Sequence, residues 1–404
     1  MVRNWVLNAL YTVVYEGAYS SLYLKQHLHE VDKKDQALAT TIFYGTLRNY
    51  RYCQAMWKQY ANQNKVNKKI KVLLTMSVYQ LLFLDKVPSY AVIDEAVRCA
   101  RQIRKPAAGF VNALLRQVDR NRSLSFKNEE EEIALTYSLP EWIVKMWTAQ
   151  YGAQKALEFA KASLYESSMS VRRNVMKELP RTDRLIEIEE PVYRYCGKAL
   201  EYDPLYKEGI ISPQDLGAYD IVRMIEPKAG ETILDMCAAP GTKTMAMAET
   251  MNNTGHIDAL DLHEHRAELI RKDAARLDLD IVHATAADAT DLSDLGMYDK
   301  ILCDVPCSGY GTLARKPDIK LHMQPTDMDT LIPIQHALLD EASKHVRQGG
   351  LIVYSTCTLN KKENEKQVER FLKEHEEFEL LEQKTIEPGH RSNGFFAARL
   401  RKRK

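Results

Sequence analysis

The sequence predicts an α/β protein in which an all-helical first part precedes a doubly wound parallel sheet. Residues 2 to about 125 carry the apolar spacing of amphipathic helices, with little β-branched alternation. From Pro213 onward, candidate strands and helical segments alternate at the spacing of βαβ units. Between Ile233 and Thr244, an apolar run passes through small residues into a helix-forming segment. These three observations favour a helical domain joined to a Rossmann-like domain.

The helical domain is predicted over residues 1–127, with about six helices at the usual helix length. Breaks are expected near Asp32, in the polar run 62–69 and at Pro88. After the last break, Ser89 is placed to cap a further helix.

A small α/β connector is predicted over residues 133–208. The acidic stretch Asn128 to Glu132 before it is expected to be a linker, although its four like charges fall short of the roughly five or six that usually indicate disorder. Pro140 suits the first turn of a helix. The segment Met169 to Asn174 is strand-like, and its Arg172, Arg173 and Asn174 either contact phosphate or lie on a solvated strand edge.

The last domain is predicted over residues 209–404 as an open sheet of about seven strands. Apolar runs of strand length, each followed by a helix-forming segment, support this prediction. The candidate strands are Thr232–Met236, His256–Asp261, Ile281–Ala284, Lys300–Cys303, Gly350–Ser355, Phe378–Leu381 and Phe395–Arg399.

The composition is typical of a globular protein from a reducing compartment. The chain has 404 residues, 45% of them apolar, which is enough for more than one buried core. No apolar run reaches the ~18 residues of a membrane span, and no secretory leader pattern is present. The seven cysteines are odd in number and lack Cys-x-x-Cys pairs, which argues against a disulfide framework and a zinc site. We expect a cytoplasmic monomer without a metal.

The charge is distributed unevenly along the chain. Residues 1–127 contain 20 Lys and Arg against 8 Asp and Glu, whereas residues 128–404 contain 36 against 47. A basic domain beside an acidic body favours a partner such as nucleic acid. The alternative is that the two parts attract each other across a domain interface.

The segment Ile233 to Thr244 is expected to bind a nucleoside. Such a turn leaves helix N-terminal N–H groups at the carboxyl end of a strand, where open α/β sheets bind ligands. Because Gly241 is its only glycine, the dinucleotide fingerprint is absent and a nucleoside without phosphate is favoured. An ordinary strand-to-helix turn is the alternative. The candidate cofactor-binding residues are Cys237, Ala238, Ala239, Pro240, Gly241, Thr242 and Lys243.

Two further acidic residues follow the next two predicted strands. Asp261 ends the second strand, where a carboxylate can accept both hydroxyls of a ribose. Asp288 lies beyond the third strand, where the edge of an adenine would offer its N–H donors. Together with the turn, these residues predict an adenosine site.

Two thiols follow the fourth and fifth predicted strands. Cys307 lies three residues after Asp304 in a turn flanked by glycine, and Cys357 ends the fifth strand. In a doubly wound sheet these strand ends neighbour the cofactor turn. A single cysteine is more often a small core residue, but two at adjacent strand ends, one near an aspartate, favour catalysis.

The motifs Asp235 to Thr244, Asp304 to Gly309 and Ser355 to Thr358 resemble, in this order, those of RNA cytosine-5 methyltransferases that use S-adenosylmethionine. The helical segments Phe43 to Arg48 and Gly109 to Arg116 resemble the RNA-binding domain of the NusB family. The whole chain is therefore similar to the bacterial 16S ribosomal RNA cytosine-5 methyltransferase B family. The resemblance implies S-adenosylmethionine as cofactor and structured RNA, 16S ribosomal RNA above all, as partner.

The resemblance also implies a role for each catalytic residue. Cys357 attacks C6 of cytosine, which makes C5 nucleophilic. Asp304 binds the N3 and amine edge of the base and also belongs to the cofactor site. Cys307 removes the C5 proton as the general base. Lys243 supplies a positive field beside the thiolates.

The chain departs from the family pattern at three places. Thr242 replaces the second glycine of the first motif, and Asn393 stands where Asp is common. Near the target base, Leu216, Gly217 and Ala218 replace the more typical Glu-Ala-Ser. None of these changes removes a proposed catalytic residue. The alternatives are a transfer RNA cytosine-5 methyltransferase and a ribosome-assembly protein that binds RNA without catalysis.

Overall fold

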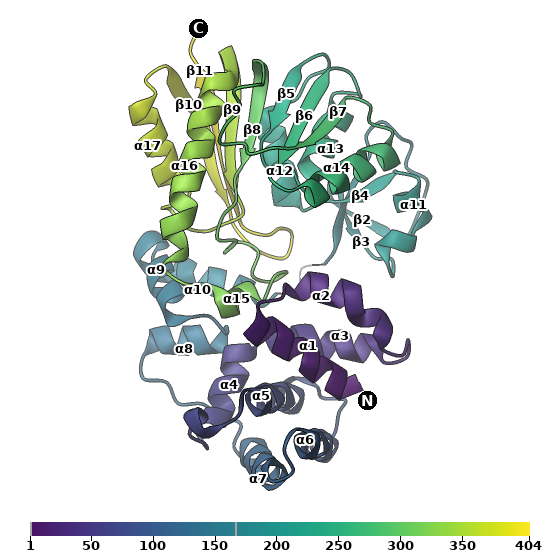
Figure 1. The fold of residues 1–404 in the computed structure, drawn as a ribbon, viewed down its shortest axis with the longest axis vertical. Coiled ribbons are helices and arrows are strands. Elements are labelled where there is room, and N and C mark those ends of the chain that lie inside the picture. The colour runs from purple at the N-terminus through teal and green to yellow at the C-terminus, as the bar shows by residue number, and fades with distance from the viewer. Residues whose placement is uncertain (1, 166–167) are drawn as a thin grey trace. The chain divides into compact units, whose positions relative to one another are not determined.

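The computed structural model describes residues 2–165 and 168–404, apart from the side chain of Gln63 (Figure 1). In this part of the chain, packing defines two compact units. The helical unit contains the residues up to Leu164 and the later segment 313–324. The sheet unit contains residues 165–312 and 325–404.

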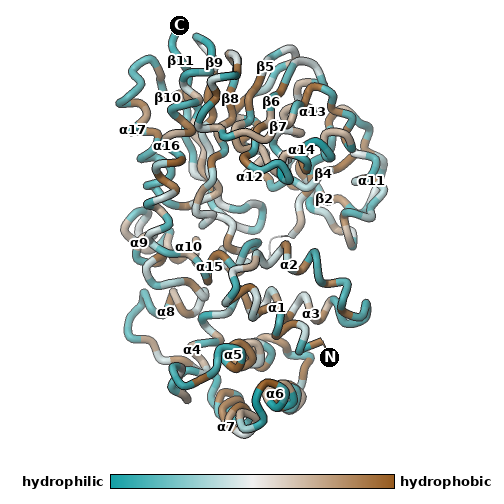
Figure 2. The backbone as a smooth tube through the Cα atoms, viewed as in Figure 1, coloured by the Kyte–Doolittle hydropathy of each residue, from teal (hydrophilic) through white to brown (hydrophobic). Residues whose placement is uncertain are grey.

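The helical unit is built around α5 (Lys68–Phe83), which is buried along most of its length and runs brown in Figure 2. An apolar helix of this kind must be covered on all sides. Its neighbours bury one apolar face each. They are α1 (Val2–Glu16), α3 (Gln36–Arg48), α4 (Tyr50–Lys58), α6 (Ser89–Ile103) and α7 (Ala107–Arg120). Helix α2 (Ser20–His27) packs on α1, and short 3-10 turns lie at Leu28–Glu30 and Gln63–Lys65.

The acidic stretch after this bundle is a helix, so its prediction as a linker was wrong. Helix α8 (Glu129–Thr136) begins after Asn128, whose side chain accepts a hydrogen bond from the backbone N–H of Glu131 at 2.8 Å. Asparagine is a favoured N-cap, and carboxylates in a first turn interact well with the helix dipole. The charge run therefore starts a helix instead of preventing one.

The predicted connector 133–208 is divided between the two units. Helices α9 (Glu141–Tyr151) and α10 (Ala153–Ala162) belong to the helical unit. The strands β1 (Ser170–Arg173), β2 (Leu185–Glu189) and β3 (Val192–Tyr195) belong to the sheet unit, where β1 also pairs with β4 (Ile211–Pro213). The short helix α11 (Pro204–Lys207) and a 3-10 turn at Leu200–Tyr202 precede β4. Pairing with β4 ties these strands to the residues that follow, and packing divides the chain at 164/165.

The predicted doubly wound sheet is confirmed. Its strand order within the described residues is β10-β11-β9-β8-β5-β6-β7. Strands β5 to β9 are parallel, and β10 and β11 pair antiparallel at one edge. The strands are β5 (Thr232–Asp235), β6 (His256–Asp261), β7 (Val282–Ala286), β8 (Tyr298–Asp304), β9 (Val346–Thr356), β10 (Phe378–Ile386) and β11 (Phe395–Lys402).

Helices cover both faces of this sheet (Figure 1). Successive side chains of a strand point to opposite faces, and accordingly Ile233 and Leu234 of β5 belong to different core clusters. The cluster around Ile233 includes α12 (Leu216–Ile225), α13 (Thr242–Thr250) and α14 (Glu264–Leu277). The cluster around Leu234 includes α16 (Asp327–His345) and α17 (Glu365–Glu374).

The segment 313–324, with α15 (Ile319–His322), packs within the helical unit. The side chain of Lys320 is fully buried there and donates from Nζ to the carbonyl of Tyr137 at 2.9 Å. Arg51 donates to the carbonyl of Lys320 at 3.1 Å, and Arg48 to that of Ala314 at 3.3 Å. These two arginines, basic residues of the predicted polyanion-binding domain, thus bind backbone carbonyls of their own unit.

Candidate active site

The chain reverses its direction across the sheet between β5 and β8, which are neighbours although β6 and β7 separate them in sequence. This is the switch point at which open α/β sheets bind ligands. Gly241 caps α13 with φ +100°, and its N–H donates to the carbonyl of Ala238 at 2.7 Å. The predicted cofactor residues Cys237 to Lys243 lie in this turn and in the first residues of α13.

Asp235 at the end of β5 belongs to the site, and the sequence analysis assigns it no role. Its side chain is buried and accepts a hydrogen bond at Oδ2 from Thr244 Oγ1 at 2.7 Å. Its Oδ1 has no hydrogen-bond partner among the described residues. Burial raises the pKa of Asp235 to about 7, with a contribution from the nearby Asp304 carboxylate. The sequence signal that could have identified Asp235 is a carboxylate at the end of a predicted strand, just before the small-residue turn.

Asp261 and Asp288 lie at the ends of paired strands. Asp261 pairs with Ala286 of β7, and the N–H of Ala287 donates to its carbonyl at 3.0 Å. The Asp261 side chain is buried, 3.4 Å from Arg266. Asp288 is exposed, and its Oδ1 accepts hydrogen bonds from the backbone N–H and the hydroxyl of Thr290, which lower its pKa. The two carboxylates therefore follow neighbouring strands but differ in burial.

Asp304 and Lys243 form an ion pair across the switch point. The other carboxylate oxygen of Asp304 accepts a hydrogen bond from Ser355 Oγ at 2.7 Å. Burial opposes the charged form of Lys243, but the Asp304 carboxylate outweighs it and leaves the lysine pKa above its usual value. The ion pair with Asp304 therefore favours the charged form of Lys243.

Cys307 and Cys357 are brought together, as the sequence predicted for the ends of adjacent strands. Their Sγ atoms lie 3.1 Å apart, and the backbone N–H of Cys357 donates to Cys307 Sγ at 3.2 Å. The turn that carries Cys307 packs tightly, since a Cβ on Gly311 would lie 2.0 Å from the carbonyl oxygen of Gly394. The hydrogen bond with Cys357, followed by burial, raises the pKa of the Cys307 thiol.

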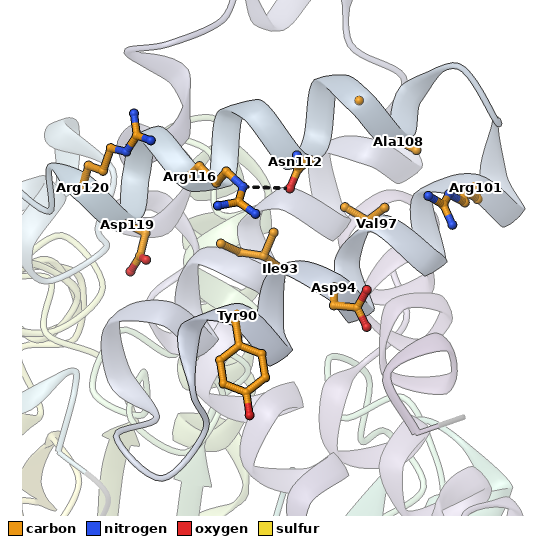
Figure 3. Close-up of a pocket in the computed structure, with 11 residues that line it drawn as sticks. Tyr90, Ile93, Asp94, Val97, Arg101, Ala108, Asn112, Arg116, Asp119 and Arg120 are labelled. Carbon is orange, nitrogen blue, oxygen red and sulfur yellow. Dashed lines mark hydrogen bonds between the residues drawn. The ribbon is translucent and has the colours of Figure 1, made fainter.

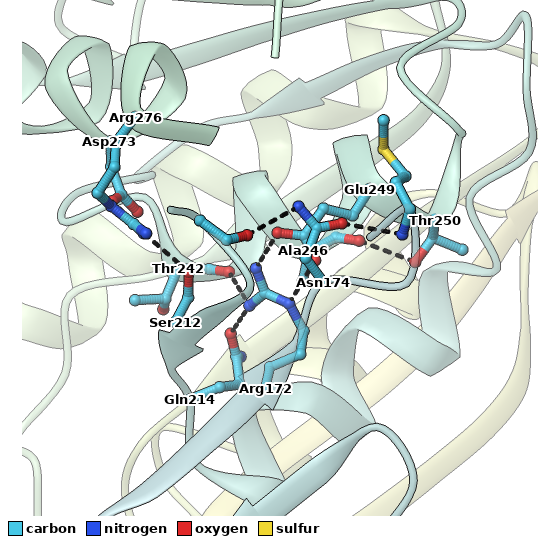
Figure 4. A network of polar contacts seen from close by, with 12 residues as sticks. Arg172, Asn174, Ser212, Gln214, Thr242, Ala246, Glu249, Thr250, Asp273 and Arg276 are labelled. Carbon is cyan, nitrogen blue, oxygen red and sulfur yellow. Dashed lines mark hydrogen bonds and ion pairs between the residues drawn. The ribbon is translucent and has the colours of Figure 1, made fainter. Parts of the chain in front are cut away.

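The predicted roles for Arg172 were both wrong, because this residue is buried in an ion pair (Figure 4). Its guanidinium binds both carboxylate oxygens of Glu249 on α13, at 2.6 and 2.8 Å. It also donates to Gln214 Oε1 at 2.5 Å and to the carbonyl of Thr242 at 3.3 Å. A cation placed in this way cannot reach phosphate and instead ties β1 to the cofactor turn.

One departure from the family pattern has a structural reason. Asp215 is buried and accepts hydrogen bonds from the Asn393 side chain at 2.8 Å and from Ser392 Oγ at 2.8 Å. An aspartate at position 393 would bring a second carboxylate against the first and could not donate when ionised. Asn393 therefore matches the carboxylate that it faces.

The helical unit carries a groove of about 430 Å³ between α6 and α7 (Figure 3). Arg101, Arg116 and Arg120 line it and make no ion pair within the described residues. The acidic lining residues Asp94 and Asp119 are instead paired with arginines outside the lining, Arg98 at 2.8 Å and Arg122 at 2.6 Å. The groove is therefore positively charged. Its lining also includes Tyr90, whose side chain is 78% exposed.

Within residues 2–165 and 168–404, no group of three or more His, Cys, Asp or Glu could hold a metal ion. No helix in these ranges is long and apolar enough to cross a membrane.

Comparison with known proteins agrees with this architecture. Residues 222–401 match the family model described as 16S rRNA methyltransferase RsmB/F, and residues 1–120 match that of the NusB family. A methyltransferase homolog from Pyrococcus horikoshii has the same fold over 69% of this chain and 100% of its own, with a TM-score of 0.59 and 24% identity. Fold and site thus define an RNA methyltransferase with a NusB-type helical part.

Full-length relatives narrow this class. The chain is 36% identical to the probable ribosomal RNA small subunit methyltransferase B of Bacillus subtilis, over 94% of this chain and 89% of that protein. It is 30% identical to the ribosomal RNA small subunit methyltransferase B of Shewanella oneidensis, over 99% of both chains. The chain belongs to the ribosomal RNA small subunit methyltransferase B family.

Proposed function

We propose that this protein methylates C5 of a cytosine in 16S ribosomal RNA with S-adenosylmethionine as methyl donor, through a covalent bond between Cys357 and C6. The observation that carries the proposal is the pair of thiols 3.1 Å apart. Beside the switch-point turn, Asp304 is paired with Lys243. A C5 methylation of this kind needs one thiolate to activate the ring and a base to remove the C5 proton.

The residues at the switch point fit the proposed cofactor. The unpartnered Oδ1 of Asp235 is a buried acceptor, which would cost free energy unless a ligand satisfied it. Asp261 would accept the ribose hydroxyls, Asp288 would face the adenine edge, and residues 237–243 would surround the methionine part. When bound, S-adenosylmethionine supplies the methyl group as a sulfonium.

The chain's own residues would act on the cytosine in sequence. The Cys357 thiolate forms a bond to C6, and the electron pair of the C5–C6 double bond moves to make C5 nucleophilic. Asp304, oriented by Lys243 and Ser355, holds the N3 and amine edge. After methyl transfer, the Cys307 thiolate takes the C5 proton, the double bond re-forms and the bond between Cys357 and C6 breaks.

The groove of the helical unit supports RNA as the partner. Its three arginines make no ion pair within the described residues, so they suit phosphates. An exposed ring such as that of Tyr90 can stack on a base of single-stranded RNA. Transfer RNA as substrate and RNA binding without catalysis remain the competing functions. The presence of both thiols, of Gly241 in the turn and of Asp261, Asp288 and Asp304 favours catalysis over a pure assembly role.

Bisulfite sequencing of ribosomal and transfer RNA tests the proposal. RNA from a strain that lacks the gene is compared with RNA from the same strain complemented with wild type or with Cys357→Ala. We expect one or more 16S methylcytosines to be absent from the deletion strain and to return only with the wild type. A missing methylcytosine in transfer RNA would select the competing substrate. No missing methylcytosine, together with no S-adenosylmethionine binding by calorimetry, would select the assembly role.

A further inference from the structure

Glu363, between β9 and α17, is a fully buried carboxylate that the proposed mechanism does not use. Its Oε1 accepts hydrogen bonds from Ser308 Oγ at 2.5 Å and Asn360 Nδ2 at 3.0 Å. Its Oε2 accepts from the Ser308 N–H at 2.9 Å and Gln335 Nε2 at 3.0 Å. All these partners act as donors, so both oxygens act as acceptors, as in an ionised carboxylate.

The charge of Glu363 is held by neutral groups. No Lys, Arg or His forms an ion pair with it in the part of the chain that the structure describes. A buried carboxylate is stable without a cation when several donors solvate it. Because the surroundings exclude water, its negative charge acts strongly on nearby titratable groups.

The donors that surround Glu363 hold the turn that carries Cys307. Ser308 directly follows Cys307, and the Gln335 amide that binds Glu363 also donates to the carbonyl of Pro306 at 3.0 Å. Both chain neighbours of Cys307 are therefore linked to this carboxylate, one directly and one through Gln335. Movement of the turn would break several hydrogen bonds at once.

The next residue, Asn364, holds the chain on both sides of Cys357. Its side chain donates to the carbonyl of Thr358 at 3.0 Å and accepts from Thr356 Oγ1 at 2.6 Å. The two turns are also joined directly, since Ser308 Oγ and Thr358 Oγ1 lie 2.6 Å apart. The consecutive residues Glu363 and Asn364 thus fix the separation of the two thiols.

The two thiols have different charged neighbours. The Glu363 carboxylate contributes to the raised pKa of Cys307, after the hydrogen bond with Cys357 and burial. Lys243, which is paired with Asp304, interacts electrostatically with Cys357. An anion near a thiol disfavours the thiolate, and a cation favours it.

We propose that Glu363 is the positioning residue that makes the two thiols different: it clamps the Cys307 turn beside Cys357 and directs the negative charge of the pair toward Cys357. The inference deepens the proposed function, on which it rests, because it supplies a reason for Cys357 to be the nucleophile. Once Cys307 has lost its own proton to solvent, the same carboxylate makes the Cys307 thiolate a stronger base, which suits the removal of the C5 proton.

The test is the pH dependence of alkylation of each cysteine by iodoacetamide, measured by mass spectrometry on the full chain without RNA. For each thiol, the pH of half-maximal rate is recorded, because this midpoint follows the thiolate fraction and is independent of access. In the wild type, Cys357 is expected to have the lower midpoint. In Glu363→Gln, the gap between the midpoints is expected to narrow by about one pH unit, a roughly tenfold change in relative thiolate population.

Two variants serve as controls. Glu363→Asp keeps the negative charge, and in this variant Cys357 is expected to keep the lower midpoint. Glu369→Gln removes an equal charge from an exposed position of α17 and is expected to leave both midpoints unchanged. Cofactor binding and a cooperative thermal transition report whether each variant is folded.

The proposal is overturned if Cys307 reacts at the lower pH in the wild type, or if folded Glu363→Gln keeps the wild-type gap. The order of the two midpoints in the wild type tests the proposal even if the Glu363→Gln variant fails to fold. Since no RNA is present, the alkylation result is independent of methylation. If Cys357 has the lower midpoint but bisulfite sequencing finds no methylcytosine missing from the deletion strain, only the proposed function fails.

Discussion

Cys307 and Cys357 place their Sγ atoms 3.1 Å apart, although 49 residues separate the two cysteines in the sequence. The strands that precede them, β8 and β9, are parallel neighbours, with Asp304 opposite Ser355. Because the thiols differ in their charged surroundings, their removal should have different consequences.

The first prediction separates the two thiols by their alanine variants. Cys357→Ala cannot attack C6, so neither methylated RNA nor a covalent complex is expected. Cys307→Ala can attack and transfer methyl but cannot release the product, so a slow-migrating protein–RNA species is expected on a denaturing gel. The methylated form of this species requires S-adenosylmethionine, and the double variant should not form it. Accumulation in Cys357→Ala instead would place the nucleophile at Cys307.

The second prediction concerns the cofactor site. Asp261→Ala and Asp288→Ala are each expected to weaken S-adenosylmethionine binding in calorimetry, because each removes an acceptor for adenosine. A lost buried hydrogen bond costs about 1 to 3 kcal/mol, and the effect should be larger for buried Asp261 than for exposed Asp288. Asp280→Ala, at an exposed position before β7, is the control. Wild-type affinity in both site variants would show that adenosine lies elsewhere.

The third prediction concerns RNA affinity. Each alanine substitution at Arg101, Arg116 or Arg120 is expected to reduce the log–log salt slope of RNA binding by about 0.7 per lost phosphate contact. Cofactor affinity should not change. Point variants are preferable to deletion of residues 1–127, because Leu321 of the later segment packs against the same core. Lys373→Ala, exposed in α17, is the control. Unchanged slopes in all three variants would exclude the groove as an RNA site.

The fourth prediction follows from Asp235, whose pKa is raised from 3.8 to about 7 by burial. The folded state binds this proton more tightly than the unfolded state, so the contribution to stability is full below about pH 4 and is lost as the pH rises through 7. Between pH 5 and 8, the wild type is therefore expected to lose stability relative to Asp235→Asn, by about 2 to 3 kcal/mol. Urea unfolding measures this difference, and parallel pH curves would contradict it.

The fifth prediction concerns the buried pair of Arg172 and Glu249. Arg172→Met is expected to destabilise the sheet unit by about 3 to 5 kcal/mol, because it leaves a buried carboxylate without its cation. The double variant Arg172→Met/Glu249→Leu should recover most of this loss in a double-mutant cycle. The exposed pair of Arg401 and Glu379 provides the comparison, for which removal of the arginine should cost about 0 to 1 kcal/mol. Equal costs for the two arginines would contradict the assigned role.

The amino-acid sequence by itself determined the order of elements and the identity of the reactive groups. Apolar periodicity is a local property, so it distinguished the helices of residues 2–120 from the strands that begin at Thr232. Short motifs at strand ends also indicated Asp304, Cys307 and Cys357, because the carboxyl ends of parallel strands meet at one edge.

Only the tertiary structure decided the partners of these groups. Whether Arg172 meets phosphate, water or Glu249 depends on contacts between residues distant in sequence, and so does the burial of Asp235 and Glu363. The acidic run at Glu129 is a different case, because the cap bond from Asn128 that begins its helix is local and the sequence already contained this signal. Local sequence patterns specify which reactive side chains are present, whereas burial and long-range hydrogen bonds set the charge and the position of each side chain.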